Sequence, residues 1–200
     1  MTARKTGKWN EARRILRTAQ TQFRRARMQA TRQEALALKR EIVLGLTSGK
    51  PGGRRLAPLE SSTVATRRAR RIRGTKPLLA RGDLRRSISV VVTPTGDAFI
   101  GILRTATNRR GEKLVDVATV HEFGKTVVVP LTPASRRFLM ATLRTAEIRP
   151  EQTGAGETGI VVVRIPARPF LRPAFKQFSR RAKDRFLRRI AGALTGDLGG

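Results

Sequence analysis

The sequence predicts an α+β fold: a long N-terminal helix, an antiparallel sheet of four to five strands, and a C-terminal helix packed on the sheet. Three observations predict it. Residues 11–46 carry apolar side chains at spacings of three and four without a proline, which indicates a helix. Short β-branched runs bounded by Gly and Pro recur between residues 88 and 165, which indicates strands. Residues 171–194 then return to helical spacing.

The predicted N-terminal helix covers about 36 residues and would be about 54 Å long. Asn10 can cap it, and Glu11 complements the dipole of its first turn. Its apolar stripe is narrow and its other face is rich in arginine. The helix is either a solvated basic helix that lies on a domain or a helix that packs on neighbouring subunits. The stripe consists of Ile15, Ala19, Phe23, Ala26, Ala30, Ala37, Leu38, Ile42 and Leu46.

We expect three parts along the chain. Residues 1–53 form the extended basic helix and end in a Gly/Pro linker, because the run Pro51-Gly52-Gly53 interrupts the helical pattern. Residues 54–178 form the α+β core domain, with an inserted helix and a Gly-rich loop at 132–159. Residues 179–200 form the end of the C-terminal helix and a disordered tail.

Within the core domain, the elements follow from local signals. Gly82 permits a turn with positive φ, and Leu84 and Ile88 suggest one helical turn that leads into a strand. Thr132 followed by Pro133 begins a helix. The predicted helices cover residues 59–71 and 133–146, the latter with Phe138, Leu139 and Leu143 facing the core, and the predicted strands cover 88–92, 98–103, 126–129 and 160–165, with a polar loop at 105–113 and an apolar stretch at 115–120.

Three prolines follow the last predicted strand. Pro166, Pro169 and Pro173 each fix φ, remove an N–H donor and disfavour helix in the preceding residue, while Pro173 also suits the first turn of a helix. Arg168 and Phe170 stand between them. We expect a rigid corner that pins the C-terminal helix onto the sheet. Arg168 would hold this corner through hydrogen bonds to backbone carbonyls or to an acidic partner.

The chain is strongly basic, with 43 Lys and Arg against 14 Asp and Glu and a formal net charge of +29. Such a charge predicts contact with nucleic acid, an anionic membrane or acidic protein surfaces. Cysteine is absent, which excludes disulfides, and no apolar run reaches the ~20 residues of a membrane span. The Arg-rich N-terminus also admits a mitochondrial transit peptide as a minor interpretation.

Two basic clusters are the candidate contacts with DNA or acidic partners. They either bind phosphate or carboxylate groups or form a solvated face. Tyrosine is absent and no aromatic residues alternate with the basic runs, so only sequence-independent phosphate contact is expected. The clusters are Arg67, Arg68, Arg70, Arg71 and Arg73, and Arg109, Arg110 and Lys113 in the polar loop.

No enzyme site emerges from the sequence. His121 is the single histidine and stands beside Glu122. The pair is either a general base with its orienting carboxylate or, as we favour, a buried imidazole satisfied by backbone next to a structural acid. The scattered carboxylates do not converge as metal ligands would. We therefore predict no catalysis, no metal and no cofactor.

Three motifs occur in a fixed order. The first contains Gly82, Leu84, Ser87 and Ile88, the second is His121-Glu122-Phe123-Gly124, and the third contains Pro166, Arg168, Pro169 and Phe170. In this order they resemble the phage virion morphogenesis and tail-completion family, to which neck proteins of long-tailed phages look similar. The chain departs from the family pattern at Arg81, Val117 and the inserted segment 132–159.

The resemblance implies a structural protein of the virion that assembles as a ring, most simply of six copies, at the head–tail junction, and it implies no catalysis. Double-stranded DNA would pass through the ring without sequence-specific contact. Head connector or adaptor proteins and tail terminator or tail tube proteins would be its neighbours, no membrane would be involved, and the host cytoplasm would be the place of assembly. The alternative is a sequence-independent nucleic-acid-binding protein of ribosomal or chromatin type.

Overall fold

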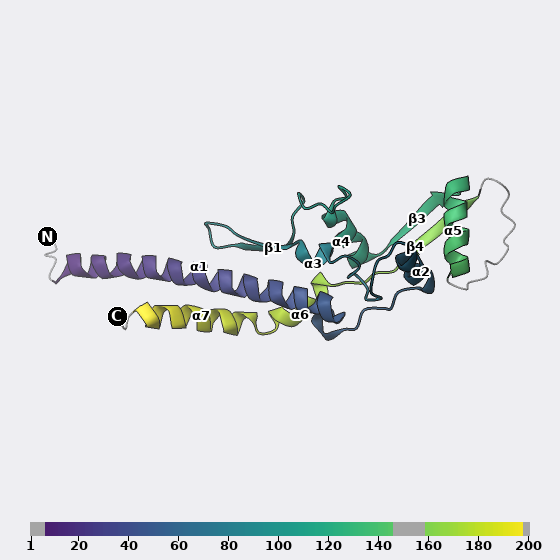
Figure 1. Cartoon of the computed structure of the whole chain (residues 1–200). Helices are drawn as coiled ribbons and strands as arrows, with labels where there is room; N and C mark the ends of the chain where they lie inside the picture. Colours follow the sequence, from purple (N-terminus) through teal and green to yellow (C-terminus); the bar gives the residue numbers. More distant parts are fainter. Residues whose placement is uncertain (1–6, 146–158, 198–200) are drawn as a thin grey trace. The chain divides into compact units, whose positions relative to one another are not determined.

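The computed structural model describes residues 7–145 and 159–197 (Figure 1). Backbone contacts divide the chain into two compact units. Within the described residues, no helix is both long and apolar enough to cross a membrane. Unit 1 comprises Met1–Ala37, Val90–Phe99 and Ser179–Gly200, and unit 2 comprises Leu38–Ser89 and Ile100–Phe178.

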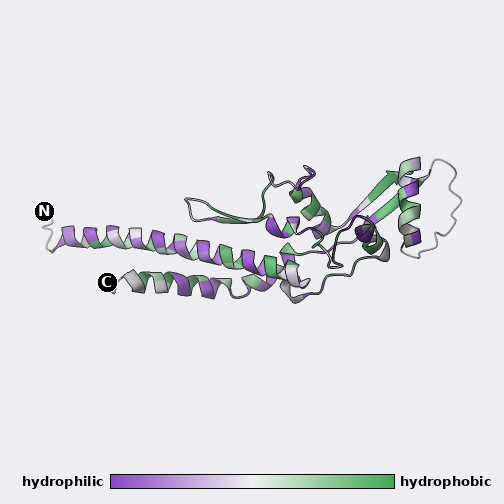
Figure 2. Cartoon of the chain, in the orientation of Figure 1, coloured by the Kyte–Doolittle hydropathy of each residue, from purple (hydrophilic) through white to green (hydrophobic). Residues whose placement is uncertain are grey.

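The N-terminal helix α1 runs without interruption from Trp9 to Ser48, so the predicted long helix is confirmed. Its 40 residues correspond to a length of about 60 Å. It begins before Asn10, so the predicted cap is wrong, whereas Glu11 does lie in the first turn. Hydrophobic and hydrophilic residues alternate around it along its whole length (Figure 2).

The core of unit 2 gathers apolar residues from five segments. The C-terminal end of α1 contributes three residues spaced by four, and the short helices that follow contribute others. These helices are α3 (Asp83–Arg86), α4 (Leu114–Phe123) and α6 (Leu171–Ser179). Phe170 is fully buried in this core. The buried members are Leu38, Ile42, Leu46, Leu84, Ile88, Ile102, Leu114, Ala118, Phe170 and Ala174.

The strands form two separate antiparallel pairs, so the prediction of one sheet with four to five strands is wrong. Strand β1 (Ile88–Val92) pairs with β2 (Ala98–Ile102), and β3 (Lys125–Pro130) pairs with β4 (Ile160–Ile165). The second pair is in register from Lys125 opposite Ile165 to Pro130 opposite Ile160. The apolar stretch 115–120 lies between the pairs in sequence, but it is helical because it buries residues four apart on one face of α4.

The predicted C-terminal helix is broken in two and does not pack on a sheet. Helix α6 ends at Ser179, and α7 runs from Ala182 to Asp197. Each half buries its apolar side chains elsewhere: α6 in the core of unit 2, and α7 against α1 in unit 1. The apolar residues that the sequence places on one continuous helix therefore belong to two separate hydrophobic cores. The α1–α7 contact contains Ala26, Ala30, Phe186, Ile190, Ala193 and Leu194.

Two further helices of unit 2 contact each other: α2 (Ser61–Ala69) and α5 (Pro133–Thr145). The hydroxyl oxygen of Thr132 accepts the backbone N–H of Ser135 at 3.2 Å, so the predicted start of α5 is confirmed. Phe138 is 43% exposed and lies against the Arg70 guanidinium, so its core placement is wrong. The Leu143 side chain, the Gly-rich loop up to residue 158 and residues 198–200 lie outside the described residues.

Candidate functional site

The corner between β4 and α6 is held by Arg168, whose side chain is nearly buried. Its Nε donates to the carbonyl oxygen of Ala57 at 3.1 Å, and its Nη2 donates to that of Pro58 at 2.7 Å. Of the two partners expected for Arg168, the structure shows backbone carbonyls. The guanidinium thus ties the third motif to the segment that precedes α2, more than a hundred residues earlier in the chain.

Glu122 caps helix α6. Its carboxylate accepts the backbone N–H groups of Phe170, Leu171 and Arg172 at 2.8, 3.1 and 2.9 Å. These are the donors that the first turn of a helix leaves without an intrahelical partner, and the next residue, Pro173, has no N–H to satisfy. A carboxylate at this end also complements the helix dipole. Glu122 is therefore not an orienting group for His121.

The rest of the second motif contacts the same segment. The His121 carbonyl accepts the N–H of Arg168 at 2.6 Å, and the Arg172 guanidinium lies 4.4 Å from the centre of the Phe123 ring. Gly124 has φ +78°, and a Cβ there would lie 3.1 Å from the carbonyl oxygen of Ile165. All four residues of the second motif therefore contact the third motif or its flanks, and the two motifs form one interlocked joint.

The first motif lies in and beside the core of unit 2. Gly82 precedes α3 with φ +78°, in the left-handed region that favours glycine. Leu84 and Ile88 are buried in the core. The hydroxyl of Ser87 donates to the carbonyl of Leu84 at 2.8 Å. These contacts give the motif a structural explanation.

His121 differs from its predicted state. Its Nδ1 is buried but has no hydrogen-bond partner among the described residues, so the expected backbone partner for the imidazole is not found. Burial lowers the pKa of His121 from its ordinary value, and the positive charges of Arg168 and Arg67 lower it further. The ring is therefore neutral at physiological pH.

A cleft of about 430 Å³ opens beside His121. It collects side chains from α2, α4, β4 and the loops before α3 and α4. Of the predicted basic contacts it includes Arg67, Arg70, Arg109 and Arg110, whereas Arg68, Arg71, Arg73 and Lys113 are not among its lining residues. It also includes Arg81, Arg164 and Arg168, which the sequence did not associate with these clusters because each comes from a different segment.

Arg67 shows that part of the first basic cluster is structural. Its guanidinium donates to the carbonyls of Gly74 and Lys76 at 3.2 and 2.9 Å, so it holds the loop that follows α2. Burial and the nearby charge of Arg168 lower the pKa of Arg67 from its ordinary value. Arg67 is therefore not a freely solvated cation, and no acidic side chain of the described residues forms an ion pair with it.

In the described part of the chain, no group of three or more His, Asp or Glu side chains could hold a metal ion. A model of the phage virion morphogenesis family matches residues 7–194. The chain belongs to the phage virion morphogenesis family. Searches of curated proteins and of solved structures find no match. This virion morphogenesis protein is thus a structural virion protein and not an enzyme, as the motifs predicted, and other virion proteins are its partners.

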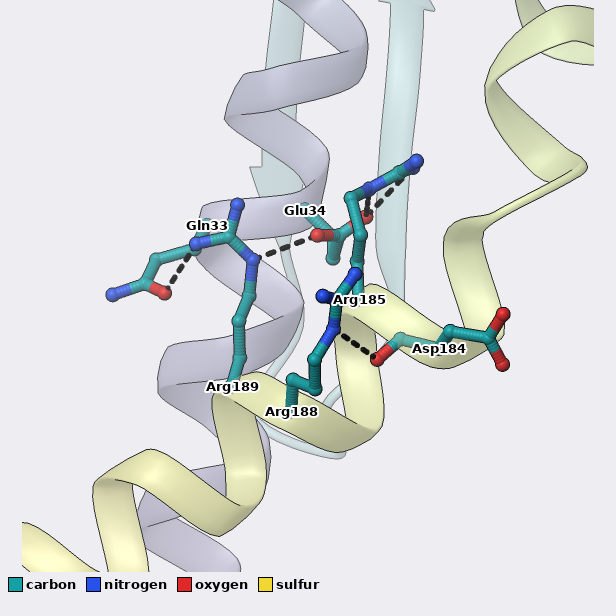
Figure 3. A network of polar contacts seen from close by, with 6 residues as sticks. All are labelled: Gln33, Glu34, Asp184, Arg185, Arg188 and Arg189. Carbon is teal, nitrogen blue, oxygen red and sulfur yellow. Dashed lines mark hydrogen bonds and ion pairs between the residues drawn. The ribbon is translucent and has the colours of Figure 1, made fainter.

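In unit 1 of this virion morphogenesis protein, a polar network joins α7 to α1 (Figure 3). The Glu34 carboxylate, nearly buried, accepts from Arg189 Nε at 2.7 Å and pairs with Arg185 Nη2 at 3.1 Å. Arg189 Nη1 also donates to Gln33 at 2.7 Å. Because one carboxylate holds two arginines of α7, the network fixes the position of α7 along α1.

Proposed function

We propose that this protein is a tail-completion or neck protein that forms a ring, most simply of six copies, at the head–tail junction. DNA passes through the ring, which joins head connector or adaptor proteins to tail terminator or tail tube proteins. Family membership supports the virion role. The observation that supports assembly into a ring is the exposed apolar face of α1.

That face begins where α7 covers α1 and continues beyond it. Ala26 and Ala30 are buried against α7, whereas Ile15, Leu16 and Phe23, nearer the start of α1, are 58%, 69% and 49% exposed. Large exposed apolar groups that continue a buried contact mark an association surface. We infer that neighbouring copies pack here, which favours the second of the two interpretations of the N-terminal helix.

The net charge of the proposed ring indicates that the ring has acidic partners besides DNA. Six copies would carry a formal charge of +174, six times +29. If the height of the ring equalled the length of α1, about 60 Å, the ring would enclose only about 35 phosphate charges of a DNA duplex. Acidic faces of the adjoining virion proteins would balance much of the remainder. Because charges are screened beyond about 8 Å at physiological salt, this pairing occurs at contact distance.

The substitution Leu16→Asp tests the assembly surface. It places a charge in the apolar face and should abolish ring formation and head–tail joining, measured by the mass of the assembled protein and by the yield of joined particles. Thr21→Asp is the matched control, because Thr21 is a polar, exposed residue of α1 and the added charge is the same. Equal loss in both variants, or assembly of the Leu16→Asp protein, would refute the proposed surface.

A further inference from the structure

The cleft beside His121 contains more positive charge than its own side chains balance. Among the described residues, seven arginines line it against three carboxylates. Two of these carboxylates already have partners: Asp83 pairs with Arg86 at 2.5 Å, and Glu112 accepts from Asn108 at 2.6 Å. A concave site with low-dielectric walls concentrates the field of such charges. The electrostatics of the cleft therefore favour an anionic ligand.

The two most buried cations of the cleft contact neutral groups. The hydrogen bonds of Arg168 and Arg67 described above all go to backbone carbonyls. Neither guanidinium forms an ion pair within the described residues. Carbonyls orient a guanidinium but leave its charge uncompensated, and a carboxylate near it would form a charge-assisted contact of the strong kind.

Strand β4 forms one wall of the cleft. Three consecutive residues at the end of β4, from Val163 to Ile165, line the cleft together with the following Pro166. Because consecutive side chains of a strand alternate between its two faces, the cleft meets β4 along its edge and not on one face. The opposite edge of β4 pairs with β3, and no further strand joins this sheet in the described chain. An extended segment can add to such an edge through main-chain hydrogen bonds.

The remaining walls are apolar and suit a peptide better than a nucleic acid. Leu59, Ile72, Leu78 and Val117 line them. Neither Phe nor Trp occurs among the described residues that line the cleft, so bases would find no phenyl or indole ring to stack on. A volume of about 430 Å³ holds a few side chains and is too small for a duplex.

We propose that this cleft is a docking site for an extended acidic segment of another virion protein, which lies along the edge of β4 and places carboxylates against the arginines while its apolar side chains meet the apolar walls. That the segment comes from a virion protein rests on the proposed function. Its chemistry, alternating acidic and apolar side chains in an extended conformation, rests on the cleft alone.

The test uses the full chain and a fluorescent, acetylated and amidated decapeptide of alternating Glu and Val, followed by anisotropy. We expect saturable binding, at least about tenfold weaker for the Gln–Val version of the peptide. Absence of binding up to about 1 mM peptide would overturn the proposal.

Two charge-matched double variants locate the contact. Arg109→Gln with Arg110→Gln removes two charges that line the cleft, and should weaken peptide binding at least about tenfold. Arg71→Gln with Arg73→Gln removes two charges outside the lining, and should change it less than about threefold. Equal losses would mean that net charge alone attracts the peptide, which refutes a docking site.

Two further results separate the possible outcomes. A short DNA duplex is the competitor. The cleft is a nucleic-acid site and the proposal is wrong if the duplex displaces the peptide and if the substitutions at Arg109 and Arg110 weaken duplex binding more than peptide binding.

The binding assay needs no assembly. A protein that forms the ring but does not bind the peptide therefore contradicts the docking site alone, whereas one that binds the peptide but forms no ring contradicts only the proposed function.

Discussion

Replacement of Glu122 tests the joint between the second and third motifs. In Glu122→Gln the side chain keeps its size but loses its charge and one of its two acceptor oxygens. One carboxylate oxygen accepts from both Phe170 and Leu171, and the other accepts from Arg172. An amide can preserve one of these arrangements but presents its NH₂ group to the remaining donor. At least one charge-assisted hydrogen bond is therefore lost.

The magnitude follows from the burial of this joint. A hydrogen bond to a charged group contributes about 1.5–3 kcal/mol, and loss of the interaction with the helix dipole adds up to about 1 kcal/mol. We expect Glu122→Gln to lower the free energy of unfolding by about 1.5–4 kcal/mol and Glu122→Ala by about 3–5 kcal/mol. These losses are large against a typical total stability of about 5–15 kcal/mol.

Urea unfolding followed by far-ultraviolet circular dichroism measures this loss, because the single tryptophan, Trp9, lies in the first turn of α1 and belongs to unit 1, whereas the joint belongs to unit 2. Glu41→Gln is the matched control: Glu41 is an exposed residue of α1, and its change should stay within about 0.5 kcal/mol. If Glu122→Gln were as mild as this control, the carboxylate would not hold the start of α6 and the reasoning would be refuted.

Three other substitutions probe separate parts of the structure. Gly124→Ala forces a Cβ at positive φ against Ala167 and the neighbouring backbone, and should lower the free energy of unfolding by about 1–3 kcal/mol in urea titrations. Glu34→Gln removes the carboxylate that holds Arg189 and its neighbour on α7, and should increase amide hydrogen exchange in α7 about tenfold. A histidine whose folded pKa is lowered costs stability as pH falls below its unfolded value of about 6.5. His121→Gln should therefore reduce the loss of stability between pH 7.5 and pH 5.5.

Matched variants isolate each effect. Gly111 has the same φ as Gly124 but open space around its Cβ position, so Gly111→Ala should cost less than Gly124→Ala. Equal costs would contradict the close contact. Unchanged exchange in α7 after Glu34→Gln would mean that apolar packing alone holds this helix. A pH dependence of stability identical to that of the original protein after His121→Gln would contradict the lowered pKa.

The sequence predicted elements whose signals are local. Thr132 and Pro133 mark the start of α5, Gly82 marks a turn with positive φ, and the absence of proline along residues 11–46 marks the long helix. The proline corner was also predictable, because each proline restricts its own φ and the residue before it. For Arg168 the sequence predicted hydrogen bonds either to backbone carbonyls or to an acidic partner, but it did not show which of the two.

Features that depend on contacts between residues far apart in the sequence were not predictable from local signals. Helical spacing continues through Ser179 to Ala182, so the sequence did not show that α6 and α7 pack in different cores. The adjacency of His121 and Glu122 suggested a catalytic pair or a buried imidazole, whereas the carboxylate caps a helix 48 residues away. The cleft combines arginines from separate segments, which only the fold brings together.

The mass of the protein as it occurs in assembled particles tests the central claim most directly. Native mass measurement of the complex released from purified virions should give a closed ring, about 133 kDa for six copies of the 22.1 kDa chain. A protein that is absent from virions, or that is released from them only as a 22.1 kDa monomer, would contradict the account.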